Sequence, residues 1–443
     1  MTKNISEVER RTIRRVAWRL LPLIVIIYLV AYIDRTNVSF AATGGMSNAL
    51  GLDAKDYGFG AGIFFLGYFL FEVPSNLFLE EIGARRWIAR IMITWGLMAG
   101  AMAFAQGPTS FVIMRFFLGV AEAGFFPGVI LYFTYWFPKT YRSRVLSTLY
   151  LAVPVANAVT AAISGALLGL DGALGIAGWQ WLYLVEAAPA VLLGFVVLRY
   201  LTDRPEIANW LKPDEKTWLS STIEAERQTL LSRQSRHMTL WRTFTDLRVL
   251  SLAMMYFTIV SATYGITFFL PQIVKGLGGS DVRTGLLTAA PYLVGTVGLL
   301  VWSWSSDKTK ERKWHYIIAC LLGAAGLATA GYYGSTLTAL VAVAIATIGL
   351  YGCKAPFWTM PSEFLTGTAA AGGIAMINSV GNLGGFVGPF VVGWIKDSTG
   401  GFANALYFLA ACAVISGILA FMTAPSRKTA AADVMSGVTR VST

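Results

Sequence analysis

Long apolar runs recur along the whole chain. A helix needs about 20 mainly apolar residues to cross the hydrocarbon core of a bilayer, and twelve runs reach this length. We therefore predict an all-α membrane protein with twelve membrane-spanning helices. The approximate cores of these helices are residues 16–40, 57–79, 87–106, 109–133, 145–170, 178–201, 249–273, 284–304, 314–334, 337–361, 370–395 and 402–424.

One polar stretch, residues 202–248, interrupts this pattern after the sixth run. It divides the chain into one six-helix half at residues 1–201 and a second at residues 249–443, which ends in a short tail. We expect the stretch to be a solvated cytoplasmic linker, with a short surface helix at Ser221–Arg233 as the alternative. Two six-helix halves joined by a long loop are typical of transporters built from internal repeats.

The composition points to a membrane protein as well. Apolar residues make up 56% of the 443 residues and charged residues only 13%, whereas soluble domains carry about a quarter charged residues. An ordinary soluble enzyme is therefore excluded. The net charge of +11 comes largely from Lys and Arg near the N-terminus and in the loops after the second, fourth and eighth runs. By the positive-inside rule both termini lie in the cytoplasm.

The cysteines and histidines give no sign of a metal site. Cys320, Cys353 and Cys412 lie in apolar runs without paired spacing, so neither a disulfide framework nor a zinc site is indicated. His237 and His315 are too far apart to suggest a metal cluster. We expect neither a metal nor a cofactor.

Seven charged residues lie deep inside the predicted spans, away from their ends. A charged side chain at the bilayer centre costs at least about 2.5–3.5 kcal/mol, so each is expected to face a cavity or a partner. Four are acids and three are bases, which permits nearly complete pairing. They are Asp34, Arg35, Glu72, Arg115, Glu122, Glu186 and Lys354.

The spacing of four of these residues limits how they can pair. Asp34 and Arg35 are adjacent, so their side chains point about 100° apart on a helix. Each needs its own partner, unless the pair marks a helix end at the headgroups. Arg115 and Glu122 are seven residues apart and share a face, but about 10 Å separates them along the axis. A ligand or a group on another helix must lie between them; a packing ion pair is the alternative.

The other three buried charges are assigned by their neighbours. Lys354 lies one turn before Trp358, which places both on one face. We predict that Lys354 faces a cavity, with snorkelling to the inner surface as the alternative. Glu72 and Glu186 are interpreted as interhelical hydrogen-bonding groups without substrate contact.

Together these charges predict a central cavity for an anion. Arginine binds carboxylates in a forked geometry, which favours Arg35 and Arg115, with Lys354, as anion-binding residues. Buried carboxylates beside arginine are candidate proton carriers, because an incoming anion would compete with them for the arginine. The pattern indicates proton–anion symport.

Two loops at equivalent positions of the two halves combine acids and bases. The loop after the second span carries Glu81, Arg85 and Arg86, and the loop after the eighth carries Asp307 and Arg312. Such groups can form ion pairs between helices that close the inner face, and these pairs would break on opening. The alternative is that these loops carry bases only because they are cytoplasmic, without forming ion pairs between helices.

Several motifs resemble the anion:cation symporters of the major facilitator superfamily, and the resemblance spans all twelve predicted helices. It implies alternating-access uptake of organic anions such as tartrate, phthalate, hydroxyphenylacetate or sugar acids, coupled to protons. The motifs are Asp34-Arg35-Thr36-Asn37, Glu72-Val73-Pro74-Ser75-Asn76, Arg115 through Pro127 with Tyr135-Trp136-Phe137-Pro138, and Asn378 through Gly385.

The resemblance also implies roles for single residues. Arg35 would hold the substrate carboxylate, Asp34 and Glu122 would carry the coupling protons, and Arg115 would balance Asp34. Further substrate-binding positions, which match those of galactonate-type members, are Tyr32, Tyr68, Trp358 and Asn378.

Departures from the family pattern bear on the substrate. Sugar-acid members tend to have a polar amide in the fifth helix, where this chain has Val153-Pro154, with Asn157 a turn further on. Members also often lack a base at the position of Lys354. The chain thus lacks the amide that would bond a substrate hydroxyl and gains the cation of Lys354. Both differences favour a dicarboxylate or an aromatic carboxylate, with a galactonate-like sugar acid as the alternative. Glu80 and Glu81 replace the usual aspartate of the first loop motif.

Other classes fit less well. A drug–proton antiporter is less well supported, because this class commonly has a Gly-Pro-rich motif in the fifth helix and because buried bases bind organic cations poorly. Export of an organic anion, in contrast, fits the same charges. A membrane enzyme would need a catalytic pair of residues, a metal site or a cofactor-binding loop. A sensor would need an added domain. We expect a monomeric multi-pass transporter of the bacterial inner membrane. Its partners are a small organic anion, protons and the lipid bilayer, and not nucleic acid.

Overall fold

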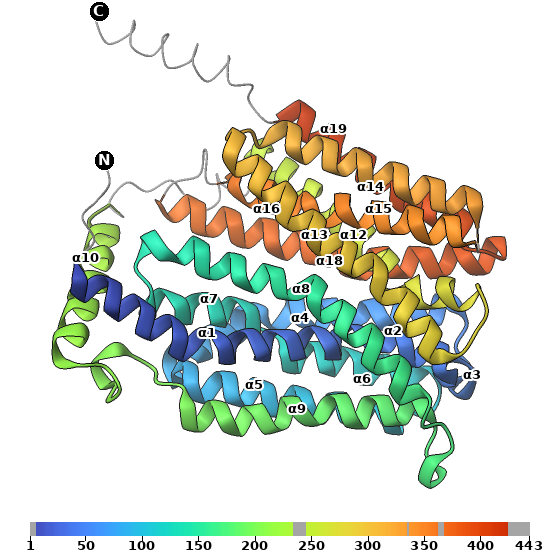
Figure 1. The fold of residues 1–443 in the computed structure, drawn as a ribbon, viewed down its shortest axis with the longest axis horizontal. Coiled ribbons are helices and arrows are strands. Elements are labelled where there is room, and N and C mark those ends of the chain that lie inside the picture. Colours follow the sequence, from blue (N-terminus) through green and yellow to red (C-terminus); the bar gives the residue numbers. More distant parts are fainter. Residues whose placement is uncertain (1–5, 234–244, 335, 362–366, 424–443) are drawn as a thin grey trace, which may run out of the picture.

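The computed structural model describes residues 6–233, 245–334, 336–361 and 367–423, and its long helices run side by side (Figure 1). In this part of the chain twelve spans are long and apolar enough to cross a membrane, as the apolar runs predict. Several spans extend beyond the predicted cores, because their polar first and last turns belong to the helix but not to the apolar run.

The first half contains six spans, of which the first and the fourth are interrupted. The first span consists of α1 (Glu7–Thr36), α2 (Val38–Ala41), a π-helical turn (Ala42–Met46) and α3 (Ser47–Leu50). The others are α4 (Ala54–Ile82), α5 (Ala84–Ala101), α6 (Gly107–Glu122) with α7 (Phe125–Trp136), α8 (Lys139–Leu168) and α9 (Gly178–Tyr200).

The second half repeats this arrangement, and its fourth span is interrupted too. Its spans are α12 (Leu247–Lys275), α13 (Asp281–Thr309), α14 (Lys313–Tyr333), α15 (Leu337–Gly352) with α16 (Lys354–Thr359), α18 (Gly367–Thr399) and α19 (Ala403–Thr423).

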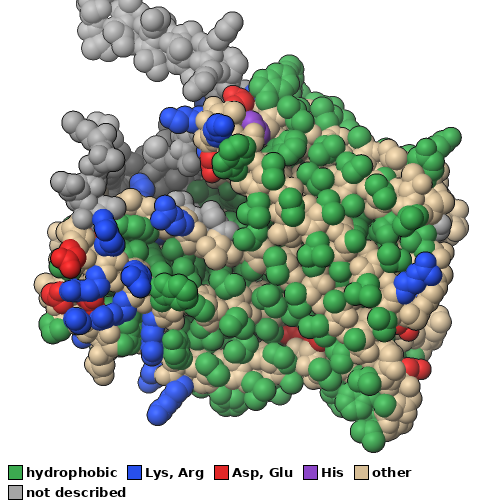
Figure 2. Space-filling view, viewed as in Figure 1, with side chains coloured by type: hydrophobic (Ala, Val, Ile, Leu, Met, Phe, Trp, Pro, Cys, Tyr) green, Lys and Arg blue, Asp and Glu red, His purple; other side chains and the backbone are tan. Residues whose placement is uncertain are grey.

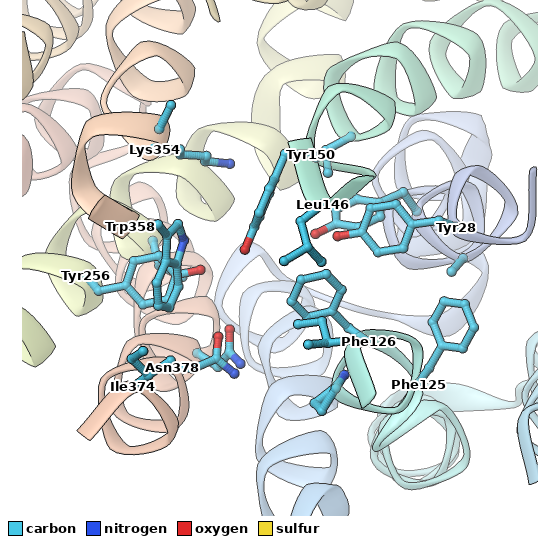
Figure 3. Close-up of a pocket in the computed structure, with 18 of the residues that line it drawn as sticks. Tyr28, Phe125, Phe126, Leu146, Tyr150, Tyr256, Lys354, Trp358, Ile374 and Asn378 are labelled. Carbon is cyan, nitrogen blue, oxygen red and sulfur yellow. The ribbon is translucent and has the colours of Figure 1, made fainter. Parts of the chain in front are cut away.

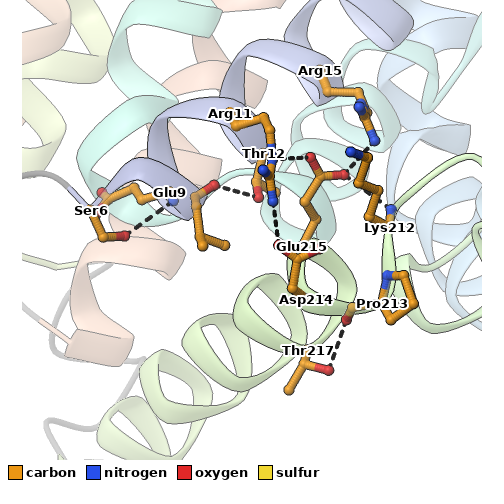
Figure 4. Close-up of polar contacts among 11 residues, drawn as sticks. Ser6, Glu9, Arg11, Thr12, Arg15, Lys212, Pro213, Asp214, Glu215 and Thr217 are labelled. Carbon is orange, nitrogen blue, oxygen red and sulfur yellow. Dashed lines mark hydrogen bonds and ion pairs between the residues drawn. The ribbon is translucent and has the colours of Figure 1, made fainter.

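The stretch between the halves differs from the expected solvated linker. It forms α10 (Pro213–Arg233), which begins eight residues earlier than the surface helix considered from the sequence. Pro213 opens the helix and acids follow it, as helix N-termini favour. The Glu215 side chain is fully buried and accepts hydrogen bonds from Arg11 (2.9 Å) and Arg15 (2.6 Å) of α1 (Figure 4). Residues 234–244 of the predicted linker lie outside the described part.

A second contact fixes α10 to the start of α8. Glu226 accepts a hydrogen bond from the backbone N–H of Lys139 (2.9 Å) and forms an ion pair with Arg142 (3.0 Å). The free N–H groups at a helix N-terminus favour an acid there. The linker helix is therefore an integral part of the first half.

Charged side chains gather at one end of the molecule. Figure 2 shows a broad hydrophobic band in the middle and a cluster of Lys and Arg where α10 lies. We call this the α10 end, and the opposite end, where α4 begins and α18 finishes, the far end. The distribution is the one that a membrane-spanning bundle with a basic face on one side requires.

The two halves are in close contact at the far end. Asp397 of α18 accepts hydrogen bonds from the backbone N–H groups of Ala54 (3.2 Å) and Lys55 (2.6 Å) at the start of α4. Gly58 brings α4 so near to α18 that a Cβ there would lie 2.3 Å from the Pro389 carbonyl oxygen. Only glycine permits this approach, and the far end is closed.

Candidate functional site

A cavity of about 1380 Å³ lies between the two halves. Figure 3 shows its two walls: Tyr28, Phe126 and Tyr150 come from the first half, and Lys354 and Trp358 from the second. The lining continues to Glu80, Arg144, Asp307 and Arg312. These residues lie at the α10 end, so the cavity reaches that end while the far end is closed.

Two interrupted spans place charged residues at the cavity. After Glu122, Ala123 leaves the helical conformation and Gly124 adopts a left-handed one (φ 81°), which L side chains rarely adopt. In the other half the helix is interrupted at Cys353, directly before Lys354. Interruptions at corresponding positions of two repeats are typical of substrate sites in transporters.

Arg35 of α1 points into the cavity and pairs with Glu122 of α6. The two side chains are 11% and 1% exposed, so the ion pair is largely shielded from solvent. Arg35 also lies 3.4 Å from the hydroxyl of Tyr264 and 4.9 Å from the ring centre of Tyr32. A carboxylate that enters here must therefore compete with Glu122 for a guanidinium.

Asp34 and Arg115 lie behind the cavity wall. Asp34 is buried and accepts a hydrogen bond from the indole N–H of Trp95 (2.7 Å). Arg115 is fully buried and donates to the backbone carbonyls of Gly60 (3.4 Å) and Ala61 (3.1 Å) of α4.

The ion pairs of the described residues do not join Asp34 to Arg115, which differs from the balance that the resemblance implies. The carbonyl groups beside Gly60 are close enough to take the guanidinium, since glycine lets α4 and α6 approach. A direct contact of Arg115 with substrate would require this packing to rearrange.

Lys354 lines the cavity on the second half. Its ammonium lies 4.5 Å from the ring centre of Tyr351, and none of the ion pairs among the described residues includes it. Trp358 follows one turn later on the same wall and packs edge-on against Tyr256 with ring centres 5.0 Å apart. Among the described residues Lys354 is thus a cation in the cavity without an ion-pair partner, unlike Arg35.

Glu72 and Glu186 each bond to a neighbouring helix, as their interpretation as interhelical groups predicts. Glu186 accepts a hydrogen bond from Ser164 (2.8 Å) between α9 and α8. Glu72 accepts one from Asn378 (3.2 Å), which connects α4 of the first half to α18 of the second. Glu72 and Asn378 both line the cavity, whereas Glu186 does not.

The cavity also contains tyrosines that sequence reasoning missed. Tyr32 and Tyr68 are predicted and do line it, but so do Tyr28, Tyr150, Tyr256 and Tyr264. No spacing in the sequence separates these from the tyrosines of the packed core. Their only signal is a phenol hydroxyl inside an apolar run, which a buried tyrosine shares.

Two of the bases predicted to close the inner face form ion pairs. Arg312, just before α14, pairs with Asp307 in the last turn of α13 (2.7 Å). Arg85 pairs with Asp203 (3.9 Å), and its backbone N–H donates to the same carboxylate (2.7 Å). Glu81 and Arg86 are exposed. In the state described here these groups therefore hold segments within one half.

In the described part of the chain no group of three or more His, Cys, Asp or Glu side chains is arranged to hold a metal. Cys320, Cys353 and Cys412 are buried free thiols. His315 contacts Ser305 (3.0 Å), and His237 lies outside the described residues.

Comparison with known proteins shows the same architecture and several close relatives. Residues 24–389 match the model of the Major Facilitator Superfamily. A protein of Agrobacterium vitis named "Putative tartrate transporter" is 50% identical over 95% of this chain and 97% of its own length. A "Quinolone resistance transporter" of Acinetobacter baumannii is 44% identical over 94% of this chain and 95% of its own.

Two solved structures have the same fold at low sequence identity. A partially occluded inward-open form of the xylose transporter XylE from E. coli superposes with a TM-score of 0.76 at 13% identity, over 94% of this chain and 99% of that one. An inward-facing bacterial homolog of the lysosomal transporter Spinster gives 0.72 at 17% identity, over 93% and 95%.

Proposed function

The chain belongs to the Major Facilitator Superfamily, a family of membrane transporters and not of enzymes, and from this premise we propose that it is a proton-coupled symporter of a small organic carboxylate. The observation that carries the proposal is the cavity between the halves, in which Arg35 and Lys354 face the same space from opposite halves. Two cations in a shielded cavity favour an anion with two carboxylates. The relatives named as tartrate transporters support this substrate class.

The substrate that we propose is a dicarboxylate such as tartrate, with an aromatic carboxylate such as phthalate as a related guest. One carboxylate binds Arg35 and the other binds Lys354. A galactonate-like sugar acid is the alternative, because it has one carboxylate and several hydroxyls. The aromatic side chains on both walls provide apolar contact for the carbon chain.

Proton coupling is proposed to arise at the Arg35–Glu122 pair. Breaking a buried ion pair leaves an uncompensated charge, which is costly in a low-dielectric site. When a substrate carboxylate takes Arg35, Glu122 loses its partner and is stabilised by binding a proton. Asp34 is the second candidate carrier. Proton uptake with substrate would appear as alkalinisation of a weakly buffered medium when the anion is added to cells or vesicles.

The transport cycle is proposed to alternate between a state open at the α10 end and one open at the far end. The closed far end and the cavity that reaches the α10 end describe the first of these states. Asn157 and Tyr351, which hydrogen-bond across the halves (2.8 Å), must separate for the second. Pairing of the substrate carboxylates with Arg35 and Lys354, together with a proton on Glu122, leaves fewer unpaired charges in the cavity and lowers the cost of closing it to water.

A thermal-shift screen against carboxylates tests the anion site. A ligand that binds the folded state raises the apparent Tm by mass action. We expect tartrate or phthalate to raise the Tm of the purified protein at acidic and at neutral pH, and the Arg35→Ala variant to lose this shift. Arg86→Ala, which alters an exposed arginine, is the matched control and should respond like wild type.

The same screen can contradict the proposal. If no carboxylate shifts the Tm while organic cations do, the symporter proposal fails and a drug exporter takes its place. If carboxylates stabilise Arg35→Ala as well as wild type, the anion site lies elsewhere.

Both termini and the α10 end are proposed to lie in the cytoplasm of a bacterial cell. The native cysteines are buried, so an introduced cysteine can report the side of the membrane. In intact cells we expect a membrane-impermeant maleimide to label Lys55→Cys at the far end and not Lys308→Cys at the α10 end. Labelling of both on permeabilised cells is the control, and the reverse pattern in intact cells would invert the topology.

Export of an organic anion is a second candidate function. It is favoured by the 44% identity to the relative named as a quinolone resistance transporter, and the static charges serve both directions. Uptake and efflux can be distinguished by measuring transport of the labelled anion in vesicles of opposite orientation under the same imposed proton gradient. A symporter accumulates the labelled anion on the side toward which the protons flow, whereas an antiporter accumulates it on the opposite side.

A further inference from the structure

Two buried oxygen atoms that belong to cavity-lining residues lack hydrogen-bond donors among the described residues. One carboxylate oxygen of Glu72, Oε1, accepts from Asn378 (3.2 Å), but the other, Oε2, has no partner among the described residues although Glu72 is only 6% exposed. Asn76 donates to the backbone carbonyl of Glu72 (2.8 Å), which fixes the orientation of its amide. Its Oδ1 is likewise buried without a partner.

These two acceptors belong together. Glu72 and Asn76 lie one turn apart on α4, hence on the same face, and both line the cavity. Tyr68, one turn to the other side of Glu72, lies next to the guanidinium of Arg35, with 5.5 Å between its ring centre and Cζ. The acceptors therefore continue the same face of α4 away from the Arg35 position.

Unpartnered buried acceptors need a donor. A buried polar group without a hydrogen bond costs about 1–3 kcal/mol, and a carboxylate of a substrate cannot relieve this cost because it only accepts. A substrate hydroxyl can, since it donates one hydrogen bond. The negative charge of Glu72 also repels a carboxylate at this point, so that the carboxylates of a substrate are directed to the cations.

We propose that Glu72, supported by Asn76 and Asn378, is a hydroxyl-recognition site that selects hydroxy-dicarboxylates over dicarboxylates without hydroxyl groups. The inference rests on the proposed function and deepens it. It also revises the sequence-based interpretation, in which Glu72 has no contact with substrate. The bond to Asn378 engages only one oxygen of Glu72 and leaves the second for a ligand.

The position of Glu72 between the halves gives this selection a further effect. Glu72 belongs to the first half and its partner Asn378 to the second, so a hydroxyl bound at Glu72 lies at a contact between the two halves. A ligand without a hydroxyl does not occupy this position. Recognition of the hydroxyl is thereby linked to the junction of the two halves.

Tartrate and succinate test the proposal, because both have four carbons and two carboxylates and differ by two hydroxyls. We expect the purified full-length protein to bind tartrate at least about tenfold more tightly than succinate in calorimetry, since a site built for a hydroxyl rejects the analogue that lacks it. Malate, with one hydroxyl, should fall between them. In Glu72→Met the tartrate-to-succinate ratio should fall to near one.

Two further variants keep the test decisive. Glu72→Gln retains an acceptor and the shape of the side chain, so it should fold and retain part of the ratio while binding succinate more tightly than wild type does. Glu186→Gln changes a buried acid that does not line the cavity and should leave the ratio unchanged. Size-exclusion profiles and melting curves establish that each variant is folded.

The possible outcomes separate this inference from the proposed function. A wild-type protein that binds both ligands equally, or a ratio that persists in both Glu72 variants, overturns hydroxyl recognition and leaves the carboxylate proposal intact. An equal loss of both ligands in Glu72→Met and Glu72→Gln assigns Glu72 a structural role and overturns it too. A wild-type protein that binds no carboxylate at either pH overturns the proposed function itself, and the inference with it.

Discussion

The two cations of the cavity differ in what they already bind. Arg35 is paired with Glu122 and surrounded by aromatic rings, whereas Lys354 lies over the Tyr351 ring and takes part in none of the ion pairs of the described residues. A carboxylate that binds Lys354 gains a new partner without displacing one. A carboxylate at Arg35 must replace Glu122. In the proposed mechanism the first contact therefore contributes affinity, and the second links binding to the charge state of Glu122.

Replacement of Lys354 tests this division of roles. In Lys354→Ala we expect the affinity for a dicarboxylate to fall at least about tenfold, because truncating one partner of a desolvated charge contact costs about 2–5 kcal/mol in proteins. A matching monocarboxylate that binds at Arg35, as the proposed coupling to Glu122 requires, should lose less than about threefold. Binding is measured by calorimetry at one pH and ionic strength.

The control for Lys354 is a lysine outside the cavity. Lys396 lies near the far end and donates to Gln272 (3.1 Å), so Lys396→Ala should leave both affinities unchanged. If Lys354→Ala weakens the dicarboxylate and the monocarboxylate equally, the second carboxylate does not bind Lys354.

How far the sequence predicts such contacts is clear from Asp34 and Arg35. Their adjacency correctly predicts that they have different partners, because that follows from helix geometry alone. The identities of these partners, Trp95 and Glu122, depend on how three helices are rotated against each other. No local pattern contains that rotation, and a tryptophan in an apolar run gives no sign that its N–H meets an acid.

At the scale of elements, α10 connects regions that are far apart in the sequence. Its Glu215 accepts hydrogen bonds from α1 and its Glu226 from α8. The sequence predicts a polar stretch here, but the composition of α10 resembles that of a solvated segment. The burial of Glu215 arises from the bases of α1, about 200 positions earlier, so the sequence near α10 does not reveal it.

Neutralising Glu215 is expected to loosen this attachment. Glu215→Gln keeps the size of the side chain but removes the charge shared by Arg11 and Arg15, so the Tm of the detergent-solubilised protein should fall by several degrees. Asp214→Asn changes the neighbouring acid, which pairs with Arg11 but is 48% exposed. It is the matched control and should have a much smaller effect, since exposed ion pairs contribute little.

Limited proteolysis gives an independent measure of the same attachment. Cleavage within residues 202–248 should become faster in Glu215→Gln than in wild type. An unchanged Tm together with unchanged cleavage would mean that α10 does not depend on Glu215.

At the scale of the whole molecule, the two ends differ in how closely the halves approach. At the far end, backbone groups of α4 and α18 are in contact through glycines. At the α10 end, the cavity separates the halves. The apolar runs predict the twelve spans and the division into halves, but they do not depend on how closely the halves approach at either end, and so the sequence cannot indicate which end is closed.

Filling the far-end contact should shift the balance between the two states. A Cβ at Gly393 would lie 2.1 Å from the Ala54 carbonyl oxygen, so Gly393→Val is incompatible with the closed far end. We expect this variant to fold, to transport several-fold more slowly, and to favour the state open at the far end.

Distances between spin labels on the two halves at the far end measure this shift, and they should lengthen in Gly393→Val. Gly401→Ala is the control, because no atom lies within 4 Å of a Cβ there. Wild-type distances in Gly393→Val would show that closure of the far end does not depend on this contact.

The attachment of α10 to α1 has a consequence for biosynthesis. Arg15 leaves the ribosome 200 residues before Glu215, which at about 5–20 residues per second corresponds to roughly 10–40 s. During that interval five further spans are made while the basic face of α1 has no Glu215. The first half therefore cannot complete its own structure until the linker that follows it has been translated. A nascent chain stalled before residue 215 would be expected to leave α1 open to quality-control proteases.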